Sequence, residues 1–323
     1  MRYRQLGDLP ILVSEIGIGT AQLSNTDGTF HGTNHIPVDQ ARTIINQAID
    51  SGVTFFDTAP TYGNTELILG ELSSDTKSQV TIATKAGVRK DHTGQISRDF
   101  SESNLTREVD QSLTRLRVDC LDLFQLNKPT RTDLADGRLF DLLHTFQDSG
   151  KIRYSGIVVG SSESALACLR SSSVDCVQIL FNLLFPEHIP IIKEAGDRGK
   201  GVIVRSPLNS GVLSGYYTPN TIFSSKDERS TFFAGTRFLD RLDRLKSIQQ
   251  QIPVSNQDLL HFSLQYILSL SEVSCVIPGA SSVDQVRDYC AVGDEPLLSA
   301  QELARATNVV LGCLQGFEQQ FQM

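Results

Sequence analysis

The chain has 323 residues, of which 40% are hydrophobic and 20% are charged, which is typical of a globular protein and excludes a disordered or fibrous one. The formal net charge is -8, and the chain has no run of lysine or arginine. This charge argues against a nucleic-acid or anionic-membrane surface and favours a small-molecule partner. Because α/β barrels often exceed about 250 residues, we expect one domain over residues 1–323.

The N-terminus and the cysteines add two expectations. The first residues lack the apolar core of a signal peptide, and no stretch approaches about 18 consecutive apolar residues, which predicts a cytoplasmic protein without a membrane span. The six cysteines are dispersed, with no C-x-x-C pair and no histidine placed to complete a zinc site. We therefore expect buried, reduced thiols and no metal. The sequence indicates no particular oligomeric state.

Short apolar runs alternate with amphipathic segments from end to end, the pattern of repeated βα units around a parallel sheet. The nearly continuous apolarity of the runs suits strands covered on both faces. We therefore expect a (β/α)8 TIM barrel. Its predicted strands are residues 16–20, 54–59, 80–86, 120–126, 154–159, 176–181, 201–205 and 274–278.

Helices are predicted between these strands, for example over residues 38–51 and 102–117, where apolar residues recur at helical spacing. Ser255 and Ser299 each precede an acid by three residues, which predicts two helix starts. Glycines placed to end helices are Gly52, Gly150 and Gly199.

Three segments lie outside eight plain βα units. Residues 2–15 predict an N-terminal β-hairpin that closes one end of the barrel. Residues 209–237 predict a long loop that is a candidate substrate lid, and the tail from Ser299 predicts an extra C-terminal helix. Substrate specificity is expected in the loops 21–37, 88–100 and 209–237.

Polar residues at the carboxyl ends of the predicted strands are candidates for chemistry, because these ends share one mouth. Asp57 ends the second strand, Tyr62 follows on the next loop, and Lys85 ends the third strand. A tyrosine with its reference pKa of about 10 is a poor proton donor, and a nearby ammonium lowers such a pKa because it favours the phenolate. We predict Tyr62 as a general acid tuned by Lys85, with Asp57 holding the lysine.

Six motifs then occur in order: Phe56-Asp57-Thr58-Ala59-x-x-Tyr62-Gly63, Thr84-Lys85, Asp122-Leu123-Phe124-Gln125-Leu126, Gly150-Lys151-Ile152-Arg153-Tyr154-x-Gly156, Ser206-Pro207-Leu208-x-x-Gly211 and Val276-Ile277-Pro278-Gly279-Ala280-Ser281. In sequence and order they resemble the aldo-keto reductase family over nearly the whole chain. The resemblance implies hydride transfer from NADPH to a carbonyl, without metal. It places Asp57, Tyr62 and Lys85 in three of four catalytic positions. The fourth is a histidine in the family and Asn127 here.

The resemblance also implies the residues that hold the nicotinamide cofactor. Gln178 matches the position that binds the carboxamide. Arg205 replaces an aromatic residue that stacks on the nicotinamide ring, and a planar guanidinium can also stack. The other cofactor positions are Gly19, Thr20, Ser206, Pro207, Leu208, Gly279, Ser281 and Gln285.

The chain departs from the family pattern at several cofactor positions. Val158 and Val159 replace a Ser-Asn pair on the carboxamide, Ser282 replaces a frequent basic residue, and Tyr289 replaces an asparagine. A 2'-phosphate would lose charge-assisted hydrogen bonds, each worth up to about 1.5–3 kcal/mol, unless Arg287 replaces them. We expect NADP(H), with NAD(H) as the alternative.

Three functions are compatible with these residues. The first is an oxidoreductase that reduces an aldehyde or ketone, or runs in reverse, with the Asn127 amide as a donor to the carbonyl. The second is a proton-transfer enzyme, an isomerase or lyase, that uses Tyr62 and Lys85 without hydride transfer. The third is a nucleotide-sensing subunit without turnover. His31 and His35 are either weak substrate contacts or surface residues of the first loop.

Overall fold

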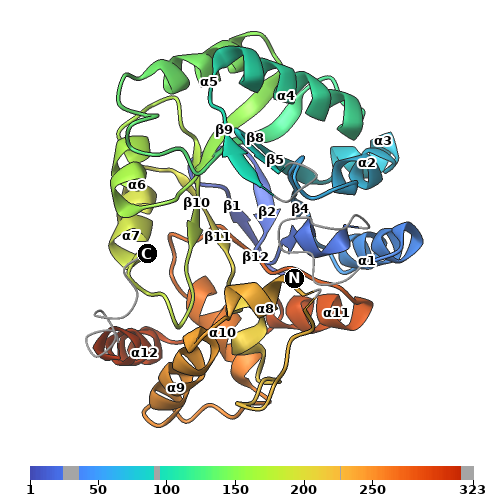
Figure 1. Cartoon of the computed structure of the whole chain (residues 1–323). Helices are drawn as coiled ribbons and strands as arrows, with labels where there is room; N and C mark the ends of the chain where they lie inside the picture. The colour runs from blue at the N-terminus through green and yellow to red at the C-terminus, as the bar shows by residue number, and fades with distance from the viewer. Residues whose placement is uncertain (25–35, 91–94, 226, 314–323) are drawn as a thin grey trace.

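The structure, a computed structural model, describes residues 1–24, 36–90, 95–225 and 227–313. Eight parallel strands form one sheet that is nearly closed into a barrel, and helices surround it (Figure 1). This arrangement confirms the predicted (β/α)8 barrel. In spatial order the strands are β3 (Ile18–Gly19), β4 (Phe55–Asp57), β5 (Thr81–Ala86), β8 (Leu121–Asn127), β9 (Ile152–Val158), β10 (Cys176–Leu180), β11 (Gly201–Arg205) and β12 (Cys275–Ile277).

The two ends of the sheet meet between β3 and β12. The backbone N–H of Gly17 donates to Val276 O at 2.8 Å, and that of Gly19 donates to Pro278 O at 2.9 Å. A parallel bridge also pairs Gly19 with Gly279. These contacts join the first strand to the last, as closure of a barrel requires.

The predicted helices 38–51 and 102–117 are confirmed as α1 and α4, and the three predicted helix-ending glycines all adopt positive φ. The α-helices are α1 (Val38–Asp50), α2 (Thr65–Gly70), α3 (Ser74–Ser78), α4 (Glu102–Leu116), α5 (Arg138–Asp148), α6 (Ser162–Leu169), α7 (Ile189–Asp197), α8 (Glu228–Phe232), α9 (Arg237–Gln249), α10 (Leu259–Leu268), α11 (Val283–Val292) and α12 (Ala300–Gly312). Two 3-10 helices are η1 (Thr20–Leu23) and η2 (Asn209–Ser214).

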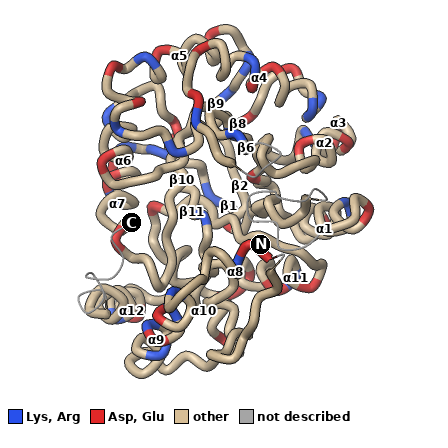
Figure 2. Tube along the Cα trace, viewed as in Figure 1, with Lys and Arg blue, Asp and Glu red and all other residues tan. Residues whose placement is uncertain are grey.

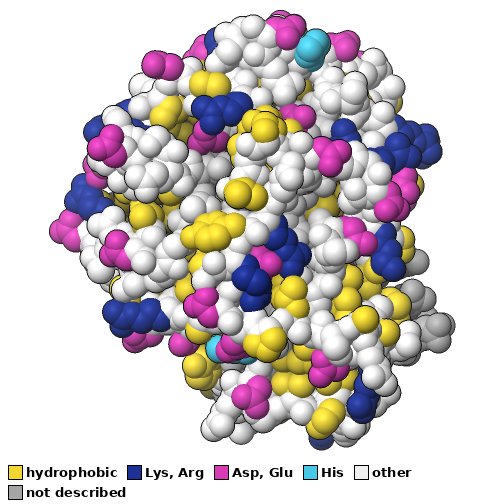
Figure 3. All heavy atoms as spheres, turned by 180° about the vertical axis from the view of Figure 1, so that it is seen from behind, with side chains coloured by type: hydrophobic (Ala, Val, Ile, Leu, Met, Phe, Trp, Pro, Cys, Tyr) yellow, Lys and Arg dark blue, Asp and Glu magenta, His cyan; other side chains and the backbone are white. Residues whose placement is uncertain are grey.

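Charged residues lie mainly on the outer layer. Acidic and basic residues alternate along helices such as α4 and α9 (Figure 2). Side chains of both signs are also interspersed over the face of the molecule shown in Figure 3. Among the described residues, we find no helix with the length and apolarity that a bilayer crossing needs.

The N-terminal hairpin closes the floor of the barrel, at the amino ends of the strands, as predicted. Its strands β1 (Tyr3–Gln5) and β2 (Leu12–Ser14) are antiparallel. Leu6 and Val13 are fully buried in the barrel interior, where they pack with inward-facing strand residues such as Leu123. The hairpin therefore supplies the lowest layer of the core.

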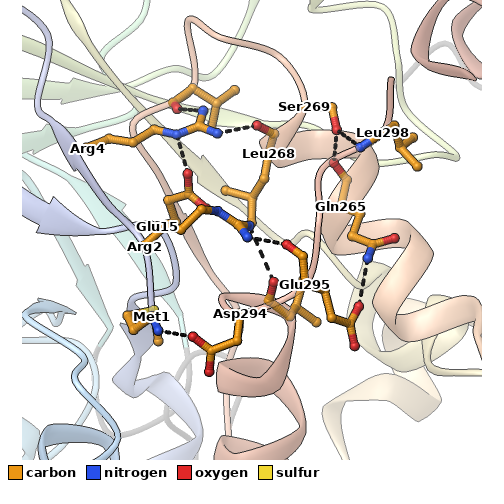
Figure 4. Close-up of polar contacts among 12 residues, drawn as sticks. Met1, Arg2, Arg4, Glu15, Gln265, Leu268, Ser269, Asp294, Glu295 and Leu298 are labelled. Carbon is orange, nitrogen blue, oxygen red and sulfur yellow. Dashed lines mark hydrogen bonds and ion pairs between the residues drawn. The ribbon is translucent and has the colours of Figure 1, made fainter. Parts of the chain in front are cut away.

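A polar network fastens this hairpin to the barrel (Figure 4). The buried Glu15 accepts hydrogen bonds from Arg2 Nε at 2.7 Å and Arg4 Nε at 2.6 Å. The Arg4 guanidinium also donates to the carbonyl oxygens of Leu268 and Val273. Each charged group at the floor thus has a partner, which is the condition under which a buried charge is tolerated.

Two predicted segments differ from expectation. Residues 209–237 contain η2 and α8, and the rings of Tyr217 and Phe223 in this segment pack against Phe238 of α9. The loop at 88–100 contains an antiparallel hairpin, β6 (Val88–Lys90) and β7 (Ile96–Arg98). The sequence missed both because their contacts lie within irregular segments without clear periodicity.

The predicted helix starts have opposite outcomes. Ser299 accepts from the Glu302 N–H and forms a complete capping box at the start of α12, as predicted. The prediction at Ser255 was wrong, because residues 256–258 form a turn and α10 begins at Leu259. Ser255 Oγ instead accepts the Asp258 N–H within that turn, at 3.2 Å.

All six cysteines are free, as predicted. Four of them are buried, whereas Cys120 and Cys313 are only half-buried, so the expectation of buried thiols was wrong for these two.

Candidate active site

Asp57 and Lys85 form a buried ion pair at the carboxyl ends of β4 and β5. Their side chains are 4% and 3% exposed, and Lys85 Nζ donates to Asp57 Oδ2 and, at 3.0 Å, to Thr58 O. Burial by itself would lower the pKa of Lys85, but the charge of Asp57 and the phenol of Tyr62 outweigh it and raise that pKa. The lysine therefore stays an ammonium at neutral pH.

Two glutamines complete the surroundings of the Asp57 carboxylate. Gln178 Nε2 on β10 donates to Asp57 Oδ1 at 2.7 Å, and Gln125 Nε2 on β8 donates to the same oxygen at 3.1 Å. The two amides are also joined to each other at 3.1 Å. With Lys85 on Oδ2, both carboxylate oxygens are satisfied, which fixes the position of the lysine.

Tyr62 lies on the loop between β4 and α2 and is half-buried. Its ring centroid is 4.9 Å from Lys85 Nζ. Gly63 follows with φ 66, a left-handed conformation that lets the chain turn from the tyrosine toward α2. The loop therefore brings the phenol against the ammonium, as the sequence predicts for a proton donor and its neighbour.

Asn127 ends β8, where it pairs in register with Val158, and is half-buried. Lys85 pairs in register with Gln125, and Asn127 lies two residues further along β8. Asn127 is therefore nearer the mouth than Lys85. Its side-chain amide makes no hydrogen bond to another residue in the part of the chain that the structure describes. Val158 and Val159, on the neighbouring strand end, are buried.

The segment after β11 is strained and incompletely satisfied. Ser206, Asn209 and Ser210 all have positive φ, between 47 and 54, which residues other than glycine rarely adopt. Arg205 Nε and Asn209 Oδ1 are buried and have no hydrogen-bond partner among the described residues. Strained backbone and orphaned buried polar atoms are expected where a ligand completes a site.

The other cofactor positions of the sequence analysis lie around β3, β12 and α11. Thr20 Oγ1 donates to Asp57 O at 3.1 Å, which ties η1 to β4. Ser281 N donates to Gln285 Oε1 at 2.8 Å, so these two residues hold each other at the start of α11. The Pro207 and Leu208 positions continue the strained segment after Arg205, with Leu208 buried.

The residues that depart from the expected cofactor pattern have contacts of their own. The Tyr289 hydroxyl donates to Gly279 O at 3.1 Å, and therefore supports the loop after β12. Ser282 caps α11 by accepting from Gln285 N. Arg287 donates to Gln47 and Asp284 on the outer surface. His31 and His35 lie outside the described residues.

Sequence reasoning missed two residues of this site. Gln125 was part of a quoted motif, but its contact with Asp57 depends on two strands that are separated in sequence. Lys128 follows Asn127 directly and has φ 57. Lys128 could have been identified from its position just beyond a predicted strand end, because such positions lie at the mouth.

Comparison with known proteins agrees with this architecture. The model of the Aldo/keto reductase family matches residues 15–310. The uncharacterized oxidoreductase YqkF of Bacillus subtilis is 27% identical over 309 residues, covering 94% of each chain. The NADH-specific methylglyoxal reductase of Escherichia coli is 26% identical, covering 90% of this chain and 93% of its own.

A solved structure supports the same conclusion. The holo form of aldo-keto reductase AKR11C1 from Bacillus halodurans has 26% sequence identity and a TM-score of 0.78, and 96% of each chain is covered. Fold, motif order and family match thus agree over nearly the whole length. The chain belongs to the aldo/keto reductase family and is an oxidoreductase of that family.

Proposed function

We propose that this protein reduces the carbonyl group of a small aldehyde or ketone to an alcohol, or runs the reverse reaction, with Tyr62 as the proton donor. The observation that carries the proposal is the contact of the Tyr62 ring with Lys85 Nζ, which is held in turn by Asp57. The carbonyl carbon gains a hydride, and the carbonyl oxygen gains the Tyr62 proton.

The roles of the other residues follow from their surroundings. Lys85 remains charged and favours the phenolate that Tyr62 becomes after it gives up its proton. Asp57, held by Gln125 and Gln178, keeps the ammonium in place. Asn127 offers an amide N–H to the carbonyl oxygen, but an amide cannot relay a proton as a histidine can.

A nicotinamide nucleotide supplies the hydride when it is bound. The unpaired Arg205 Nε and Asn209 Oδ1, on the strained segment after β11, fit such a ligand. The first turn of α11 offers backbone N–H groups to a phosphate. The residues that would hold the nucleotide are Gly19, Thr20, Gln178, Arg205, Ser206, Pro207, Leu208, Gly279, Ser281 and Gln285.

The choice between NADP(H) and NAD(H) rests on the same region. NADP(H) is the family expectation, but Ser282 caps its own helix and Arg287 contacts Gln47 and Asp284. We expect the two dissociation constants to lie within about tenfold of each other, because one charge-assisted hydrogen bond is worth on the order of 1.5 kcal/mol. Titration with NADPH and NADH, followed by fluorescence quenching, measures both.

The substitution Tyr62→Phe tests the proposed proton donor. Turnover of an aldehyde should fall by about 10²–10⁴-fold, the usual contribution of a positioned general acid, while the dissociation constant of the cofactor changes little. Tyr3→Phe, on the floor hairpin, is the matched control. Unchanged turnover in Tyr62→Phe would refute the assignment.

The same measurements separate the two alternatives. A proton-transfer enzyme would bind neither nucleotide, and a sensor subunit would bind one of them tightly without turning over any carbonyl compound.

A further inference from the structure

Glu66 is a buried acid in the first turn of α2, shortly after Tyr62 in the chain. Its side chain is 1% exposed. Glu66 Oε1 accepts from Thr84 Oγ1 at 2.6 Å, and Oε2 accepts from Arg115 Nε at 2.5 Å. Thr84 is buried on β5 directly before Lys85, and Arg115 lies in the last turn of α4. One carboxylate therefore joins α2 to both β5 and α4.

A second bond closes the Tyr62 loop, which runs between β4 and α2. The hydroxyls of Thr58 and Thr65, both fully buried, are 2.7 Å apart. Thr58 directly follows β4, and its carbonyl oxygen accepts from Lys85 Nζ at 3.0 Å. Thr65 begins α2, next to Glu66. The loop is therefore closed at its base, and its far end enters α2 at the turn that Glu66 ties to β5.

Backbone packing keeps α2 in the same place. A Cβ at Gly70, the last residue of α2, would lie 2.1 Å from Arg115 O, so the two helices approach each other at a glycine. Arg115 Nη2 also donates to Ser112 Oγ at 3.3 Å, which adds a second contact to the guanidinium. Backbone and side-chain contacts together hold α2, and with it the end of the Tyr62 loop, against α4 and β5.

Fold stability by itself does not account for this buried acid. The cost of removing two charges from water is about as large as their attraction, so a well-packed apolar pair in their place is often equally stable. Position, by contrast, depends on the carboxylate, because its bond to Thr84 joins α2 to the strand that carries Lys85. A misplacement of about 1 Å near a reacting group can cost on the order of 10²-fold in rate. A bond that fixes the distance between these two elements therefore matters for the rate.

We propose that Glu66 is a positioning residue for the proton donor, because its hydrogen bond to Thr84 holds the Tyr62 loop against β5. Arg115 is the counter-ion that keeps the carboxylate in place. The inference rests on the proposed reduction, in which Tyr62 gives its proton to the carbonyl oxygen. Glu66 is buried between α2, β5 and α4 and acts only through the place of the phenol ring, whose centroid is 4.9 Å from Lys85 Nζ.

Substitution of Thr84 tests the bond directly. Thr84→Val keeps the branched shape of the side chain and removes the hydroxyl, so kcat should fall by about tenfold or more while the cofactor Kd stays within about twofold. Thr84→Ser keeps the hydroxyl and should retain most of the turnover. Unchanged kcat in Thr84→Val would overturn the proposal.

Ser155→Ala is the matched control for Thr84→Val. It also removes a buried strand hydroxyl that contacts a carboxylate, that of Asp175 at 3.2 Å. Ser155 lies on β9, which pairs with neither β4 nor β5. We therefore expect its kcat to stay within about twofold of that of the unmodified protein. A loss as large as that of Thr84→Val would mean that any buried hydroxyl affects turnover, and would contradict the proposal.

Substitution of Glu66 separates the hydrogen bond from the charge. Glu66→Gln loses the charge, but its amide oxygen can still accept from Thr84, so kcat should stay within about threefold. Glu66→Ala removes the bond as well and should lower kcat by about tenfold or more. Equal losses in the two variants would contradict the proposal. Circular dichroism shows whether each variant is folded, and Thr84→Val supplies the test if Glu66→Ala is not.

The pH profile gives a readout that a merely structural role would not change. Reduction needs a protonated donor, and a nearby ammonium favours the phenolate. If the phenol moves away from Lys85 in Thr84→Val, kcat should decline at a higher pH than in the unmodified protein, by about half a pH unit or more. A lower kcat whose decline stays at the same pH would mean that the substitution does not act on the donor, and would overturn the proposal.

Failure of this inference is distinguishable from failure of the proposed function. If the unmodified protein reduces no carbonyl compound, the proposed function fails. Ultraviolet titration of the tyrosines then still tests the positioning, with Tyr62→Phe to identify the Tyr62 signal. Ionisation of Tyr62 at a higher pH in Thr84→Val supports the role of Glu66, and ionisation at the same pH overturns it.

Discussion

The buried charged groups at the floor of the barrel all have partners, whereas at the mouth the Asp57–Lys85 pair is satisfied but Arg205 is not. At the floor, Glu15 is bound by Arg2 and Arg4, and Arg4 also donates to backbone carbonyls (Figure 4). At the mouth, Arg205 retains a buried nitrogen without a partner in the described residues, and Arg205, Arg98 and Lys85 add positive charge near Lys128. The difference teaches that the floor is complete by itself, whereas the mouth keeps polar atoms that the described residues do not satisfy and that a ligand could bind.

Backbone conformation follows the same division. Of the five described residues other than glycine with positive φ, Arg117 ends a helix, and the other four lie just beyond strands β8 and β11. Those four are Lys128, Ser206, Asn209 and Ser210. Each such conformation costs on the order of 1–3 kcal/mol. Backbone strain is therefore concentrated at the mouth, and the stability of the floor offsets it.

The largest expected effect comes from removing the central cation of the mouth. Lys85→Met should lower turnover at least 100-fold and destabilise the protein by about 3–5 kcal/mol, because the buried Asp57 carboxylate loses its counter-ion. Steady-state kinetics and urea denaturation measure the two effects. The double variant Asp57→Asn, Lys85→Met should recover stability but not turnover. Recovery of turnover in that variant would contradict the proposed role of the ammonium.

A substitution at the floor should affect stability alone. Glu15→Ala leaves Arg2 and Arg4 without their shared carboxylate and should cost about 3 kcal/mol in the free energy of unfolding. We expect kcat/KM to stay within twofold at a temperature where the variant is folded. A loss of activity without a loss of stability would mean that floor and mouth are coupled.

Removing Lys128, a cation of the mouth that has no acidic partner among the described residues, should stabilise the free protein. Lys128 has a lowered pKa in the folded state, so its charge opposes folding below about pH 8, and this penalty disappears as the pH approaches its unfolded value near 10.5. Lys128→Met should therefore raise the free energy of unfolding by roughly 1–3 kcal/mol at pH 7. The gain should vanish near pH 10.5, and denaturation at both pH values checks this. A destabilised variant at pH 7 would contradict this electrostatic account.

The smallest effect is expected at Asn127. Asn127→His places an imidazole where the family has its fourth catalytic residue, and should raise kcat/KM for a neutral aldehyde by up to about tenfold, the worth of one hydrogen bond. Stability should change by less than about 1 kcal/mol, because Asn127 has no side-chain hydrogen bond within the described residues. A decrease in kcat/KM would show that the amide is already the better donor.

Much of the fold was predictable from local pattern. The apolar runs gave all eight barrel strands to within a few residues, because strands covered on both faces require such runs. The helix ends at Gly52, Gly150 and Gly199 were also predictable, because the positive φ at the end of a helix favours glycine. The prediction of a helix start at Ser255 was wrong because a serine followed by an acid three residues later fits a turn as well as a helix start.

The sequence by itself determined that Asp57, Tyr62 and Lys85 share one mouth, because strand ends in a parallel barrel converge there. Only the tertiary structure decided that Gln125 and Gln178 hold Asp57 and that Arg205 reaches over the end of β9 toward Lys128. The physical reason is distance along the chain: periodicity shows which face a residue occupies, but not which remote side chain it meets. Closure of the barrel brings those strands together.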